Sequence, residues 1–332
     1  MNKRVITYPL WGIMLMVLTI TVCGSCRKEK TEDTTLLSRE EQRLAEMERI
    51  DSTLIWTFPH AKEMTGWMAD SLARWEERLD ALSAEAWVLV DDSTGLVISE
   101  KNAHQRMYMA SITKMMTCLL ALERGRMDDS IQITEDVCTT RDARVKVGDG
   151  YTVGNLIREM MLMSDNVAAQ ALAKHIGGDT LTFYQMMNEK AAYLGMKGTH
   201  FANPNGMPND SNYSTASDLL RLSRYCMDDS AFATIVGTAS EDIPLLDGRH
   251  FPCQNTNALL ENYQGCIGIK TGFTRQAGNC LASAATRNGV TLYLVLLKSK
   301  SHMSRFVESA TLLDYGFQVM QAYRQHRGEK AE

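Results

Sequence analysis

Three short motifs in this chain contain the residue types that serine-dependent acyl transfer needs. In order along the chain, residues 111–114 read S-I-T-K, residues 164–166 read S-D-N and residues 270–272 read K-T-G. A serine hydroxyl is a poor nucleophile until a base removes its proton. Residues three positions apart on a helix share one face, so Lys114 can reach Ser111. The motifs therefore predict Ser111 as a nucleophile and Lys114 as its general base.

This chemistry requires an uncharged Lys114, because only a neutral amine accepts a proton. Burial and a nearby cation both lower the pKa of a lysine, and Lys270 is the candidate cation. Lys270 would also attract a substrate carboxylate. Ser111 is expected at a helix N-terminus, where backbone N–H groups favour developing negative charge. We expect the backbone N–H groups of Ser111 and Phe273 to form an oxyanion hole.

The S-D-N motif supplies two further candidates. Ser164 is expected to relay a proton between Lys114 or Lys270 and the leaving amine, and Asn166 to bond a substrate amide. The alternative is that Ser164 and Asn166 only cap a helix beginning near Val167, since both residue types cap well. S-x-x-K alone is a weak signal, because residues 25–28 match it too. The ordered set of three motifs carries the prediction.

Other catalytic and binding arrangements are missing from the sequence. We find no G-x-S-x-G, no H-E-x-x-H, no P-loop and no G-x-G-x-x-G. The histidines show no metal-ligand spacing, so neither a metal nor a cofactor is expected. The formal net charge is -5 and the chain has no dense basic stripe. Nucleic acid is therefore not an expected partner.

The pattern of apolar residues predicts strands near both ends of the main domain and helices between them. Strands are expected at 87–90, 96–98, 266–270, 279–286 and 290–297, and helices at 111–124 and 306–324. Asn288-Gly289 is typical of a hairpin turn, and K-T-G is placed where its strand closes. We predict an α/β (α+β) fold, in which strands from both ends pair into one antiparallel sheet beside an inserted helical lobe.

Residues 1–26 have the layout of an export signal. Lys3 and Arg4 precede an apolar stretch at 10–22, and residues 24–26 read G-S-C. This ending predicts a lipoprotein signal in which Cys26 is lipidated, and the alternative is an uncleaved N-terminal anchor. The chain is accordingly expected on the periplasmic side of the cell envelope, anchored to the membrane at its N-terminus.

Three further segments follow the signal. Residues 27–82 are predicted to be a charged helical spacer, or alternatively a docking surface, residues 83–325 the catalytic domain and residues 326–332 a polar tail. Six cysteines follow the signal. An oxidising compartment would permit disulfides, but the sequence selects no pairing. Cys118 lies in an apolar helical pattern and is expected to be buried.

From residue 86 to residue 317 the chain resembles the D-alanyl-D-alanine carboxypeptidases, the low-molecular-weight penicillin-binding proteins of serine peptidase family S11. The segments that carry the resemblance are 110–117, 162–168, 203–208, 213–219 and 268–274. Arg305 stands where the family places an arginine that helps to hold the substrate carboxylate. Asn205 and Asn212 stand where relatives often have histidine.

The resemblance implies a β-lactamase/DD-peptidase-like fold and the D-Ala-D-Ala end of a peptidoglycan stem peptide as substrate. Ser111 would release the terminal D-Ala through an acyl-enzyme, and β-lactams would acylate the same serine. The substrate-binding residues it implies are Asn166, Lys270, Thr271, Gly272, Phe273 and Arg305.

Three alternatives remain open from the sequence. A class A β-lactamase needs E-x-x-x-N about 35 residues after S-D-N. Residues 200–204, at that distance, read H-F-A-N-P and contain no glutamate. A DD-endopeptidase of the same family carries the same motifs. A non-catalytic cell-wall-binding protein would retain the fold without the reaction.

Overall fold

The structure is a computed structural model that describes residue 75 and residues 77–138 and 143–326. All of them belong to one compact unit, Leu44–Glu332. The predictions for residues 1–26, Cys26 among them, and for residues 327–332 lie outside the described residues. So does most of the predicted spacer.

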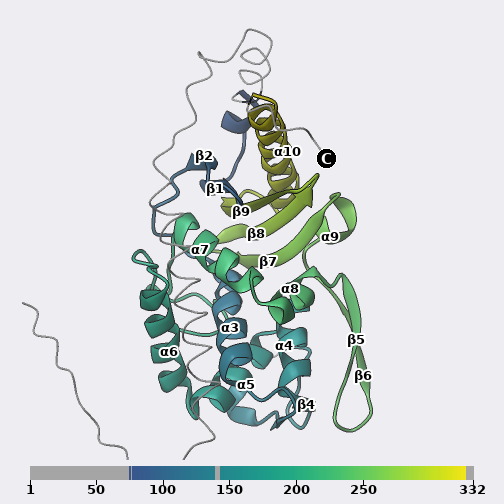
Figure 1. Ribbon diagram of the computed structural model, residues 1–332. Helices are drawn as coiled ribbons and strands as arrows, with labels where there is room; N and C mark the ends of the chain where they lie inside the picture. Colours follow the sequence, from purple (N-terminus) through teal and green to yellow (C-terminus); the bar gives the residue numbers. More distant parts are fainter. Residues whose placement is uncertain (1–74, 76, 139–142, 327–332) are drawn as a thin grey trace, which may run out of the picture. The chain divides into compact units, whose positions relative to one another are not determined.

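A five-stranded sheet joins the two ends of the described chain (Figure 1). Its order is β2-β1-β9-β8-β7, and every neighbouring pair is antiparallel. The strands are β1 (Ala86–Asp91), β2 (Val97–Lys101), β7 (Cys266–Thr274), β8 (Gly278–Arg287) and β9 (Val290–Ser299). The predicted sheet from both ends of the domain is therefore confirmed.

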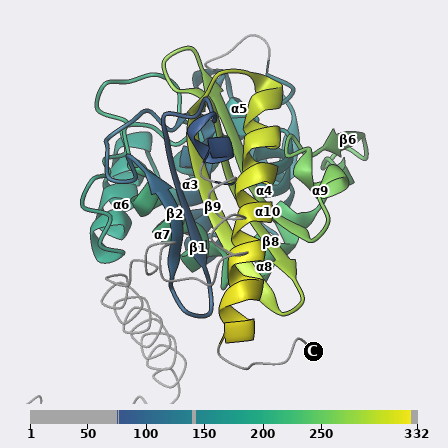
Figure 2. The same ribbon diagram turned by 90° about the horizontal axis from the view of Figure 1, so that it is seen from above.

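Both faces of the sheet are covered, and successive side chains of each inner strand enter different cores. On β9, Leu294 packs in the core beneath α10 (His302–His326), while Val295 packs in the core beneath the helical lobe. Figure 2 shows α10 lying across one face of the sheet. On the other face lie α7 (Ala216–Met227) and α8 (Ser230–Gly237).

The inserted lobe contains the remaining long helices. These are α3 (Lys114–Arg124), α4 (Val153–Leu162), α5 (Asn166–Gly177) and α6 (Thr180–Tyr193). Shorter elements are η2 (Ala110–Thr113), η3 (Glu135–Val137) and α9 (Leu259–Asn262). Two small two-stranded sheets, β3 (Ser130–Gln132) with β4 (Gly150–Thr152) and β5 (Ser240–Pro244) with β6 (His250–Gln254), were not predicted. Strands as short as these give only a weak alternation signal.

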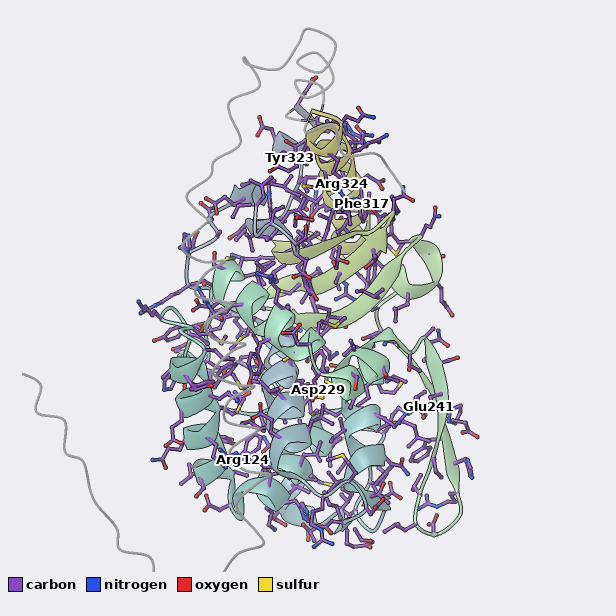
Figure 3. The ribbon with its side chains drawn as sticks, in the orientation of Figure 1. Arg124, Asp229, Glu241, Phe317, Tyr323 and Arg324 are labelled. Atoms are coloured by element: carbon purple, nitrogen blue, oxygen red, sulfur yellow. The ribbon has the colours of Figure 1, made fainter. Side chains whose placement is uncertain are left out.

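The turn between β8 and β9 has the backbone conformation that its residue types favour, and it is bound by a side chain of α10. Asn288 and Gly289 both have positive φ, 49° and 66°, which is the turn that Asn-Gly favours between β8 and β9. Arg324 on α10 donates to the carbonyl oxygens of both turn residues, at 2.9 and 2.7 Å. Figure 3 shows Arg324 on α10 with Phe317 and Tyr323. The far part of α10 is thereby fixed to the sheet.

The last residues of the segment predicted as a spacer pack against α10. Trp75 donates from its indole nitrogen to Gln318 Oε1 at 2.7 Å, and its ring lies 5.7 Å from that of Tyr315. Leu79 is buried in the core beneath α10. The described part of the chain contains no helix that is both long and apolar enough to span a bilayer.

All six cysteines after the signal are free thiols in the structure. Cys118 is fully buried on α3, as its apolar pattern predicts. Burial raises the pKa of the Cys280 thiol to about 11, so this sulfur is protonated and unreactive at neutral pH.

Candidate active site

Ser111 and Lys114 lie where η2 passes into α3. Ser111 belongs to the 3-10 turn Ala110–Thr113, and Lys114 is the first residue of the α-helix. Lys114 Nζ lies 2.9 Å from Ser111 Oγ. The predicted helix therefore begins with a tighter turn, but the spacing of three residues still places both side chains on one face.

The Lys114 amine is fully enclosed. Besides Ser111 Oγ, it contacts Asn166 Oδ1 at 2.8 Å and the carbonyl oxygen of Asn205 at 2.7 Å. Both of these oxygens can only accept hydrogen bonds. A neutral amine has two N–H groups and one lone pair, so two donations to these oxygens leave the lone pair facing the Ser111 hydroxyl. The surroundings thus match an uncharged Lys114 that accepts the serine proton.

The charges around Lys114 favour the same state. Burial lowers the pKa of Lys114 well below the usual lysine value, Lys270 lowers it further, and Asp165 opposes the shift. Desolvation disfavours the charged amine, and the neighbouring ammonium disfavours a second positive charge. Burial and Arg305 in turn lower the pKa of Lys270 to about 7. Lys270 therefore helps to keep Lys114 uncharged, and Arg305 acts on Lys270 in the same way.

The S-D-N motif connects α4 to α5. Asp165 is the N-cap of α5: its Oδ1 accepts from the backbone N–H groups of Val167 and Ala168 at 2.8 and 3.0 Å. Capping is thus performed by Asp165, and the Asn166 side chain is free to bind Lys114. Ser164 has a φ of 63°, in the left-handed region. No hydrogen bond joins its hydroxyl to Lys114 or Lys270 within the described residues.

The K-T-G motif lies inside β7 and not at its end, because the strand continues to Thr274. The prediction that the motif closes its strand is therefore wrong. Pairing of β7 with β8 extends through Thr274↔Gly278, so the ladder holds the whole motif. A Cβ on Gly272 would lie 2.9 Å from the carbonyl oxygen of Met109 and 3.2 Å from the backbone nitrogen of Ser111. Glycine is therefore needed for β7 to approach the nucleophile turn.

A second glycine touches the other side of this turn. Gly206 has a φ of 84°, and a Cβ there would lie 1.9 Å from the carbonyl oxygen of Ala110. Its neighbour Asn205 supplies the carbonyl oxygen that binds Lys114. Neither residue was predicted from the sequence to have a catalytic role. Only the N-P-N-G-M-P segment, recognised as a family signature, could have indicated them.

Arg305 and Phe273 flank the motif. Arg305 is buried on α10 and donates from Nη1 to the carbonyl oxygen of Gly272 at 3.2 Å. Burial lowers the pKa of Arg305, although an arginine keeps its charge at neutral pH. The Phe273 side chain is 59% exposed. In the part of the chain that the structure describes, no group of His, Cys, Asp and Glu side chains is arranged to hold a metal ion.

Comparisons with known proteins show the family to which this chain is related. The family model for peptidase S11, D-alanyl-D-alanine carboxypeptidase, matches residues 73–301. The chain is 30% identical over 244 residues to D-alanyl-D-alanine carboxypeptidase DacF of Bacillus subtilis, covering 71% of this chain and 63% of that protein. It is 33% identical over 243 residues to DacB2 of Mycobacterium tuberculosis, covering 70% and 82%. The chain thus spans less than two thirds of the Bacillus relative.

Solved structures show the same architecture. The Streptomyces K15 DD-transpeptidase matches with a TM-score of 0.68 and 32% identity, covering 72% of this chain and 98% of that one. DacD from Francisella tularensis matches with a TM-score of 0.64 and 32% identity, covering 71% and 70%. The sheet with its inserted helical lobe defines the class as the DD-peptidase fold. The chain belongs to the D-alanyl-D-alanine carboxypeptidase family, peptidase family S11.

Proposed function

We propose that this protein is a serine-type D-Ala-D-Ala carboxypeptidase that removes the terminal D-alanine from peptidoglycan stem peptides. The observation that carries the proposal is the enclosed Lys114 amine, 2.9 Å from Ser111 Oγ, with a lowered pKa. A neutral lysine in contact with a serine hydroxyl is the base that this nucleophile requires.

In the proposed acylation, Lys114 accepts the Ser111 proton while Oγ attacks the carbonyl carbon of the penultimate D-Ala. The backbone N–H groups of Ser111 and Phe273 receive the developing oxyanion. Gly272 supports this role, because its lack of a side chain lets β7 lie against the Ser111 backbone. The peptide C–N bond breaks, and the proton that Lys114 took from Ser111 passes through the Ser164 hydroxyl to the leaving amine. A water molecule then hydrolyses the ester: its hydroxyl group remains on the acyl carbon, and its proton restores the Ser111 hydroxyl.

In this proposal the substrate is held at both sides of the bond that breaks. Lys270, Thr271 and Arg305 bind the terminal carboxylate, and Asn166 bonds an amide of the peptide through its side chain. The support is that Lys270 and Arg305 are buried cations and that Arg305 contacts the K-T-G strand through Gly272. A carboxylate placed between them replaces the lost hydration with opposite charge.

The test is acylation by a fluorescent penicillin together with D-Ala release from a stem pentapeptide. Ser111→Ala is expected to lose both activities while circular dichroism shows an intact fold. Ser230→Ala, at an exposed serine on α8, is expected to retain both. Mass spectrometry of the labelled wild-type peptide is expected to place the adduct on Ser111, and an adduct on another serine would overturn the assignment.

Assays of the same purified wild-type protein distinguish the three alternative functions. Rapid nitrocefin turnover would indicate a class A β-lactamase. Cleavage of cross-linked dimers in preference to monomeric pentapeptide would indicate a DD-endopeptidase. Neither label nor product, from a folded protein, would indicate a non-catalytic binding protein.

We further propose that the protein is exported and held at the periplasmic face of the membrane by a lipid on Cys26. The sequence of residues 1–26 supports this, since two basic residues, an apolar stretch and G-S-C follow in the order of a lipoprotein signal. Metabolic labelling with a fatty acid is expected to mark the wild type and not Cys26→Ser. A labelled Cys26→Ser protein would overturn the lipid site, and an unlabelled, membrane-bound wild type would indicate an uncleaved anchor.

A further inference from the structure

A threonine outside the three motifs contacts two of the segments that carry them. Thr256 lies between β6 and α9, and its backbone N–H donates to the carbonyl oxygen of Leu162 at 3.1 Å. Leu162 is the last residue of α4, two positions before Ser164. Thr256 Oγ1 lies 2.6 Å from Thr271 Oγ1 in the K-T-G strand. Thr256 therefore links the end of α4 to the motif on β7.

The backbone around Thr256 is fixed by its two asparagine neighbours. The buried Asn255 side chain donates to the carbonyl oxygen of Thr238 at 2.9 Å and accepts from the backbone N–H of Asn257 at 2.9 Å. The backbone N–H of Asn255 donates to the carbonyl oxygen of Ala239 at 2.7 Å. The Thr256 hydroxyl is consequently presented to Thr271 from a rigid segment.

The direction of the hydrogen bond between the two hydroxyls follows from what Thr271 binds. Either hydroxyl can donate in the free protein. A carboxylate has no hydrogen and can only accept, so a Thr271 hydroxyl that binds a carboxylate must donate to it. Its oxygen can then accept the Thr256 hydrogen, which gives a chain from Thr256 through Thr271 to the carboxylate. Each bond in such a chain strengthens the next.

We propose that Thr256 is a positioning residue that holds the Thr271 hydroxyl as a donor to the terminal carboxylate of the substrate. This inference rests on the proposed function, because it assumes that the K-T-G strand binds that carboxylate. Thr256 acts through Thr271 and does not itself touch the reacting atoms.

The experiment compares two thioester substrates that give the same acyl-enzyme. One is an N-acyl-D-alanyl thioester of thioglycolic acid, which carries the carboxylate, and the other is the matching thioester of methyl thioglycolate, which does not. Thr256→Val removes the hydroxyl and retains the shape of the side chain. We expect it to lower kcat/KM for the acid substrate about tenfold, mainly through KM, and for the methyl ester less than twofold. Thr256→Ser is expected to restore the wild-type ratio.

The five-stranded sheet offers a matched control. Thr286 and Thr291 form another pair of threonine hydroxyls, 2.9 Å apart, between β8 and β9. Thr286→Val removes one of these hydroxyls, and we expect it to leave both substrates unaffected. Thr256→Val is also made in a Thr271→Val background, where its effect is expected to disappear because the two residues act as one chain.

Equal losses on both substrates, or an unchanged ratio in Thr256→Val, would overturn the inference. An effect that persists in the Thr271→Val background would overturn it too. If Thr256→Val does not fold, Thr256→Ala takes its place, with Thr256→Ser again required to restore the ratio. A wild-type protein that takes no fluorescent penicillin and cleaves neither thioester contradicts the proposed function itself. An active wild-type protein in which Thr256→Val leaves the ratio of the two kcat/KM values unchanged contradicts only this inference.

Discussion

The site contains two buried lysines with different roles in the proposed reaction. Lys114 is the base, and Lys270 binds the substrate carboxylate. Lys114 and Lys270 are both enclosed, and each lies in the field of another cation. Lys114 has oxygen acceptors around it that suit a neutral amine. Lys270 makes a weaker contact, a donation to the carbonyl oxygen of Thr271 at 3.3 Å. Lys270 is therefore available to a substrate carboxylate.

This arrangement predicts the pH dependence of the proposed reaction. Lys270 has a pKa of about 7, so it is an ammonium below that pH and loses its charge as the pH rises through it. Because kcat/KM reports the free enzyme, kcat/KM for a substrate with a terminal carboxylate is expected to fall above about pH 7. Neutral Lys114 is needed at all pH values, and its protonation sets the acid side of the profile. Initial rates from pH 5 to pH 10 measure this.

Lys270→Arg is the control for that assignment. A guanidinium stays charged over the whole range, so the alkaline fall is expected to disappear even if the absolute rate is lower. A wild-type profile that stays flat to pH 10 would contradict the assignment of the alkaline limb to Lys270.

Among the secondary-structure elements, the start of α5 is held by Asp165, which also binds the backbone of a second segment. Asp165 Oδ1 caps the helix, and its Oδ2 accepts from the backbone N–H groups of Arg144 and Val145 at 2.9 and 3.3 Å. The carboxylate therefore fixes Ser164 and Asn166 on either side of it. We regard Asp165 as the residue that places both.

Asp165→Ala is expected to lower the free energy of unfolding by about 2 kcal/mol or more and to slow acylation by penicillin. The matched control is Asp229, labelled in Figure 3, which caps α8 by the same two bonds, to Ala231 and Phe232. Asp229→Ala is expected to cost about 1 kcal/mol with an unchanged acylation rate. Urea titration and stopped-flow labelling measure the two effects. Equal acylation rates in both variants would remove the special role of Asp165.

Gly206 gives a second prediction at this scale. Alanine at Gly206 combines a positive φ with a collision against the Ala110 backbone. Gly248 has nearly the same φ, 83°, but nothing lies within 4 Å of its added Cβ. Gly248→Ala is therefore expected to cost about 1 kcal/mol, whereas Gly206→Ala is expected to cost at least about 2 kcal/mol more and to abolish penicillin labelling. Similar stability and labelling in the two variants would show that the turn around Ser111 can move to make room for the added methyl group.

For the molecule as a whole, the sheet connects segments that are far apart in the chain. β1 pairs with β9 through six positions, from Ala86↔Leu297 to Asp91↔Leu292. The core beneath α10 also contains Leu79, which precedes β1. The residues just before the sheet therefore contribute to the stability of the catalytic unit.

Leu79→Ala is expected to lower the free energy of unfolding by about 2 kcal/mol or more without changing penicillin labelling at low temperature. Leu181 on α6 is 75% exposed, so Leu181→Ala is expected to change stability by less than about 0.5 kcal/mol. Thermal unfolding of the two variants makes the comparison. A melting temperature of Leu79→Ala equal to that of Leu181→Ala would contradict the packing of this residue.

The features that depend on residues close together in the chain could be predicted before the structure was known. The five strands of the main sheet follow from apolar stretches, the Asn288-Gly289 turn from backbone preference, and the contact of Ser111 with Lys114 from a spacing of three residues. Three contacts became known only from the folded chain: the Asn205 carbonyl binds Lys114, Gly206 lies against the nucleophile turn, and Thr256 faces Thr271. The first two contacts join residues 91 and 96 positions apart, and no local pattern encodes which distant backbone groups meet when the sheet and the lobe close around one serine.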